Sequence, residues 1–134
     1  MKQKKTFLAL IASFNLAANY AHPITPAYFK LLGLDSAMFG YAFSVMSLGM
    51  FLGSPFFGKL AESFQSKVLM TWGCLGYSLA QVLFAIGHTP AIILWGRLLA
   101  GFACGAFFVG ALNYIANTST AKERGANLTL NAAV

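Results

Sequence analysis

Arg97 is the one charged side chain in the interior of any long apolar stretch of this chain. A guanidinium stays protonated in proteins, and at membrane depth it costs about 3 kcal/mol on insertion scales unless protein groups or a wet cavity receive it. It cannot carry a proton, but it can stabilise a nearby anion or bind carbonyl oxygens. Arg97 is therefore the leading candidate for a functional residue.

A second polar group lies near the N-terminus, where Asn15, Asn19 and His22 follow at steps of four and three. This spacing places the three side chains on one face of a helix. Lining a water-filled cavity and forming hydrogen bonds between helices both explain such a face, and both interpretations stay open. His22 is the only side chain in the apolar stretches whose usual pKa lies near neutral pH. The interiors of these stretches contain no Asp or Glu.

Glycines four residues apart predict close helix packing at two places. The pairs are Gly49 with Gly53 and Gly101 with Gly105. Bare backbone lets membrane helices approach each other closely. Steps of four also place Arg97 on the same stripe as Gly101 and Gly105.

Composition indicates which elements position these residues. Hydrophobic residues make up 58% of the 134 residues and charged residues 9%, against about 25% charged in soluble domains. Apolar runs of about 20 residues are long enough to cross a bilayer. We therefore expect an all-α membrane protein in which residues 1–134 form a partial N-terminal transmembrane lobe, with helices at about 6–29, 36–58, 67–87 and 90–116 and a fifth from about 125. Pro23 and Pro26 predict a kink or an irregular turn in the first helix.

Basic residues between the expected helices predict the orientation. Seven fall on one side, namely Lys2, Lys4, Lys5, Lys59, Lys67, Lys122 and Arg124, and Lys30 alone falls on the other. Positive charge concentrates on the cytoplasmic side of membrane proteins. We expect a cytoplasmic N-terminus, with the loops at 59–67 and 117–124 on the same side.

Several other classes of protein are not supported by the sequence. The net charge of +6 follows from topology, so no nucleic-acid partner is expected. Without a metal-ligand cluster, a nucleophile with its base or a phosphate-binding glycine loop, we expect no enzyme, no cofactor and no metal. A cleaved secretory signal is an alternative for the first stretch, but Asn19 and Ala21 form a poor cleavage site.

Two motifs resemble signatures of the major facilitator superfamily. Gly58-Lys-Leu-Ala-Glu62, with Lys67 five residues later, resembles the loop signature between helices two and three. Trp95-Gly96-Arg97-Leu-Leu-Ala-Gly101 resembles the signature of helix four. The segments at 22–34 and 54–58 are also similar to bacterial drug-efflux members.

Some positions depart from the family pattern. Glu62 stands where Asp is usual, Ser63 and Gln65 stand where a base and Gly are usual, and Ala100 stands where many efflux members have Gln. These departures affect the loop's gating strength more than the fold.

The resemblance implies a twelve-helix transporter of two lobes that works by alternating access. It implies that Arg97 acts in a central cavity and in proton coupling. From their shared helical face, we expect Asn15, Asn19 and His22 to line the same cavity. It also implies that Gly58, Glu62 and Lys67 form a cytoplasmic gate whose partner lobe lies outside this chain. The expected partners are a small-molecule substrate, protons, the lipid bilayer and that second lobe, in a bacterial inner (plasma) membrane.

Two alternatives to drug efflux remain from the sequence. One is a transporter of sugars or other metabolites, because the drug-antiporter signature of helix five lies beyond the residues given. The other is a truncated membrane fragment or interaction protein that moves nothing, since alternating access needs two lobes.

Overall fold

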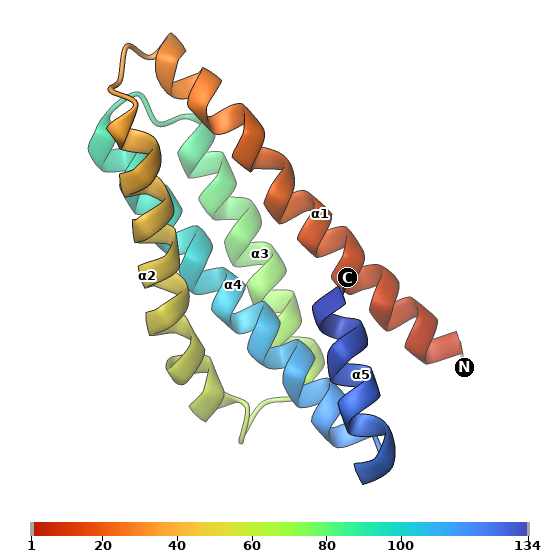
Figure 1. Ribbon diagram of the computed structural model, residues 1–134. Helices are drawn as coiled ribbons and strands as arrows, with labels where there is room; N and C mark the ends of the chain where they lie inside the picture. The colour runs from red at the N-terminus through yellow and green to blue at the C-terminus, as the bar shows by residue number, and fades with distance from the viewer. Residues whose placement is uncertain (1, 134) are drawn as a thin grey trace.

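A computed structural model describes the backbone of residues 2–133 and the side chains of residues 6–20, 22–120 and 122–129. The helices are α1 (Lys2–Leu31), α2 (Ala37–Leu60), α3 (Ser66–Ala85), α4 (Pro90–Thr118) and α5 (Ala121–Ala133). The described residues contain no strand. The first four helices run up and down with short turns between them, and α5 folds back from the end of α4 (Figure 1). The side chains of Lys2, Lys4 and Lys5 lie outside the described set.

Helix α4 is the centre of the bundle, with α2 and α3 packed against it. Glycines on facing helices meet at the contact with α2. A Cβ on Gly49 would strike the carbonyl oxygen of Leu98, one on Gly101 would strike that of Met46, and one on Gly53 would lie 2.6 Å from the oxygen of Phe102. Gly105 in turn faces the backbone of Gly53. The two glycine pairs therefore let the backbones of α2 and α4 touch.

Glycines also bring α3 against α4. A Cβ on Gly73 would lie 2.6 Å from the Phe107 nitrogen, and one on Gly110 would lie 2.9 Å from the Ser66 oxygen. Because α4 has close-packed glycines toward both neighbours, side chains along most of its length are buried. The three helices form one tightly packed layer.

Helix α1 joins this layer through side chains rather than through backbone contact. Ile11, Phe14 and Ala18 enter the same buried cluster as residues of α3 and α4. The ring of Phe14 stacks on Phe107 with centroids 3.7 Å apart, and its edge meets Tyr77 at 5.4 Å. Aromatic contacts thus hold α1 at a distance that leaves room for polar groups between the helices.

Two expectations about the helices can be compared with the structure. Helix α1 continues through Pro23 and Pro26 without an irregular turn, and a kink there stays a prediction. Helix α5 begins at Ala121, earlier than the predicted start near residue 125. The Thr120 hydroxyl donates to the Glu123 carboxylate at 3.0 Å, and the Glu123 backbone N–H donates to the Thr120 backbone carbonyl oxygen at 3.0 Å. Thr-x-x-Glu is a known signature of a helix start.

Length and composition make α2, α3 and α4 long and apolar enough to cross a membrane, within the residues that the structure describes. Helix α1 is longer than any of them, but its polar residues keep it outside that set. The turns alternate between two ends of the bundle, so the α2–α3 and α4–α5 connections share one end (Figure 1).

Candidate functional site

Arg97 projects from α4 into the space between the helices and is only 2% exposed. Its Nη2 donates to the hydroxyl oxygen of Thr25 on α1, at 2.7 Å. Its Cζ lies 3.9 Å from the centre of the Phe84 ring on α3. A desolvated cation over an aromatic face gains about 2 kcal/mol. Arg97 therefore links three helices while keeping its charge enclosed.

His22 and Arg97 border the same small void. The void is bordered also by Thr25 and by side chains of α2. Its volume of about 10 Å³ is the lower limit for one water molecule. The ring of His22 tilts against Phe43 with centroids 5.6 Å apart. Of the residues predicted to share a cavity, the structure brings these two together.

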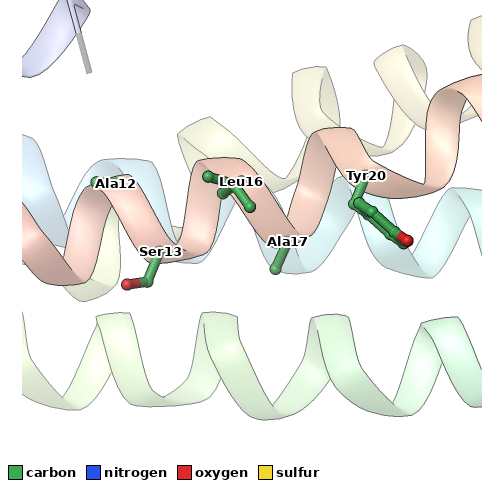
Figure 2. A pocket seen from close by; sticks show the side chains of 5 residues that line it. All are labelled: Ala12, Ser13, Leu16, Ala17 and Tyr20. Atoms are coloured by element: carbon green, nitrogen blue, oxygen red, sulfur yellow. The ribbon is translucent and has the colours of Figure 1, made fainter.

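Asn15 and Asn19 do not border the void beside Arg97, and their role as cavity-lining residues stays a prediction. The Asn19 amide donates to the carbonyl oxygen of Asn15 at 2.8 Å, so it turns back along its own helix. The pocket on this part of α1 is lined by Ala12, Ser13, Leu16, Ala17 and Tyr20, all from one helix (Figure 2). Neither asparagine contributes to it.

Thr25 and Phe84 are functional candidates that the sequence did not suggest. Thr25 is 72 residues from Arg97 and Phe84 lies on the preceding helix, and each is of a type common in membrane helices. One sequence signal was present for Thr25. It lies three residues after His22, so it extends the stripe of Asn15, Asn19 and His22 on α1.

A second polar contact joins α1 and α3, on the face of α1 that bears Thr25 and the face of α3 that bears Phe84. The Tyr77 hydroxyl donates to the Ala18 carbonyl oxygen at 3.2 Å, and the Gln81 amide donates to the Tyr77 oxygen at 2.7 Å. Tyr77 is buried. The polar groups around Arg97 therefore extend along α3.

The predicted gate residues lie around the turn that joins α2 to α3, with Gly58 near the end of α2, Glu62 in the turn and Lys67 at the start of α3. Gly58, Glu62 and Lys67 are all exposed, and a Cβ on Gly58 would meet no atom within 4 Å. The turn is tied to α4 because the Asn113 amide donates to the Ala61 carbonyl oxygen at 3.4 Å. No ion pair of Glu62 occurs among the described residues, so the carboxylate is free to meet a partner outside this bundle.

The sequence of the whole chain matches one protein family. A family model described as the Major Facilitator Superfamily matches residues 6–134. The chain belongs to this superfamily. It is an integral membrane protein of a transporter family and not an enzyme.

Among bacterial superfamily relatives, the chain is similar to two whose names describe drug resistance. It is 29% identical over 105 residues to the quinolone resistance protein NorA of Staphylococcus aureus, strain MRSA252, covering 78% of this chain and 27% of that protein. It is 26% identical over 126 residues to multidrug resistance protein 2 of Bacillus subtilis, strain 168, covering 92% of this chain and 32% of that protein. The chain thus spans about a third or less of the length of these relatives.

Proposed function

We propose that the chain is part of the N-terminal lobe of a drug exporter in a bacterial plasma membrane, with its N-terminus in the cytoplasm. The export is driven by protons and works by alternating access between this lobe and a second one. The observation that carries this proposal is the enclosed Arg97, which reaches from α4 to Thr25 on α1. The drug-resistance names of the two relatives support hydrophobic drugs as the substrate class.

Arg97 has the properties of a coupling residue in this proposal. Its charge is permanent, and the part of the chain that the structure describes gives it a hydroxyl and an aromatic ring but no carboxylate. One of its nitrogens, Nη1, is buried without a hydrogen-bond partner. A cation held in this way favours any anion that comes within reach. A proton-carrying carboxylate would therefore come from residues outside this chain, and His22 is a titratable group inside it that borders the same void as Arg97.

Glu62 and Lys67 act in the proposal as the cytoplasmic gate. The turn that bears Glu62 is anchored to α4 by Asn113, while the Glu62 side chain points into solvent. An acid on a fixed turn can pair with a basic group or a helix N-terminus of a second lobe and break that pair when the lobes rock apart.

The proposal is tested in inverted membrane vesicles that contain the full-length protein. With a proton gradient imposed, vesicles should accumulate a fluoroquinolone, and a protonophore should abolish the accumulation. Arg97→Lys should reduce the initial rate at least about tenfold, because an ammonium lacks the planar fork that holds Thr25 and leaves donors for an anion. Glu62→Gln should also slow transport. The amount of inserted protein is measured by immunoblot in each case.

Each alternative predicts a different outcome of this assay. Unchanged transport by an Arg97→Ala variant would remove Arg97 from the mechanism. Gradient-independent movement of a sugar with no quinolone uptake would favour a metabolite transporter. Absence of any transport by the full-length product would favour a membrane interaction protein.

A further inference from the structure

Two buried polar atoms lack a hydrogen-bond partner among the described side chains. They are Nη1 of Arg97 and Oε1 of Gln81. The first is a donor and the second an acceptor, so each is the kind of group that the other needs. An unpaired buried polar atom costs about 1–3 kcal/mol, and a pair of complementary ones is therefore informative.

The helix register places the two residues in one layer. Tyr77, Gln81 and Phe84 follow at steps of four and three, so they share one face of α3. Ala18 and Thr25 are seven residues apart and share one face of α1. At one end of these two facing rows of residues, the Tyr77 hydroxyl donates to the Ala18 carbonyl oxygen. At the other end, Phe84 and Thr25 hold Arg97.

Gln81 lies between these two contacts. Its amide nitrogen is engaged with the Tyr77 oxygen at 2.7 Å, which leaves Oε1 as the available acceptor. The Gln81 carboxamide therefore lies on the same face of α3 as Phe84, which contacts Arg97. Its oxygen has no hydrogen-bond partner among the described residues.

We propose that Gln81 is the α3 positioning residue of the Arg97 site. Its Oε1 accepts a hydrogen bond from Arg97 Nη1 across one trapped water molecule, which satisfies both atoms. The resulting polar chain runs from Ala18 through Tyr77 and Gln81 to Arg97 and Thr25. This chain of hydrogen bonds holds the Arg97 guanidinium between α1 and α3. It thereby sets the direction in which the remaining N–H donors of Arg97 point. The link is a property of the lobe and stands whether or not the protein exports drugs.

A double-mutant cycle on the full-length protein in lipid nanodiscs tests the link. Gln81→Glu is introduced in the native background and in an Arg97→Gln background, and the thermal midpoint of unfolding is measured. Next to Arg97 the new carboxylate gains a charge-assisted hydrogen bond. Without Arg97 it is an unpaired buried charge. We expect the native background to keep or raise its midpoint and the Arg97→Gln background to lose about 3 °C or more.

A matched control separates this link from a general effect of charge on α3. Ser78 lies on α3, is exposed and bonds to its own helix, so Ser78→Glu should change the midpoint equally in both backgrounds. Equal changes for Gln81→Glu in the two backgrounds would overturn the proposal.

If Arg97→Gln does not fold, Gln81→Glu alone decides the question. A midpoint at or above that of the native protein supports the link, and a fall as large as that of Gln81→Leu overturns it. Because none of these measurements involves transport, a negative result here leaves the vesicle assay unaffected, and the converse is also true.

Discussion

At the scale of single residues, one enclosed cation organises the candidate site. The residue type and the apolar surroundings were sufficient to single out Arg97 from the sequence. Its partners were not predictable, because Thr25 is 72 residues away in the chain and contact between α1 and α4 depends on how the helices pack. For the same reason, the cavity-lining role of Asn15 and Asn19 stays a prediction. Helical spacing gives the face of a residue but not the neighbour that the face meets.

Replacing Thr25 tests the contact with Arg97. Thr25→Val keeps the shape of the side chain but removes the acceptor, so we expect the free energy of unfolding to fall by about 1–3 kcal/mol. Thr25→Ser retains the hydroxyl and should keep most of the stability. Thermal unfolding in nanodiscs measures both variants. If Thr25→Val and Thr25→Ser lose the same free energy of unfolding, Thr25 contributes to stability through packing and not through the hydrogen bond.

At the scale of helices, bare backbone decides how α4 packs. The sequence indicated that Gly49, Gly53, Gly101 and Gly105 are packing positions, and the structure pairs them across α2 and α4. Which glycines lie in open space was not predictable from spacing. A Cβ on Gly40, also in α2, would meet no atom within 4 Å.

Gly40 supplies a matched control for the packing of Gly101. In Gly101→Ala the new methyl group meets the Met46 carbonyl oxygen, and overpacking of this kind costs about 1–3 kcal/mol. Gly40→Ala should be neutral or stabilising by up to about 1 kcal/mol, because alanine favours a helix over glycine. The yield of folded protein after detergent extraction and its unfolding midpoint compare the two. Similar behaviour of both variants would contradict the packing assignment.

At the scale of the whole molecule, the two ends of the bundle carry different charge. Lys59, Lys67, Lys122 and Arg124 belong to the end with the α2–α3 and α4–α5 connections, and Lys30 belongs to the other end. Four long apolar stretches and their order were predicted from hydropathy, and the structure has a helix at each of them, although among the described residues only α2, α3 and α4 are apolar enough to cross a membrane. The start of α5 was missed although Thr120 and Glu123 supplied a start signal, since apolar content rises only later in that helix.

Cysteine labelling tests the proposed orientation. Ser36 and Ser63 are exposed in turns at opposite ends of the bundle. In a Cys74→Ser, Cys104→Ala background, a membrane-impermeant maleimide should label Ser36→Cys in intact cells. Ser63→Cys should react only in inverted vesicles, because positive charge retains its turn in the cytoplasm. The reverse labelling pattern would invert the topology.

The bond between Thr25 and Arg97 also has a consequence for biogenesis. Chain order means that α1 leaves the ribosome before α4, so the hydroxyl is already in the membrane when the cation arrives. Arg97 then exchanges an exposed position in lipid for a prepared acceptor. Damage to α1 near Thr25 would leave the incoming arginine without that acceptor during insertion. Such damage should appear as early degradation of newly made protein rather than as a slow transporter.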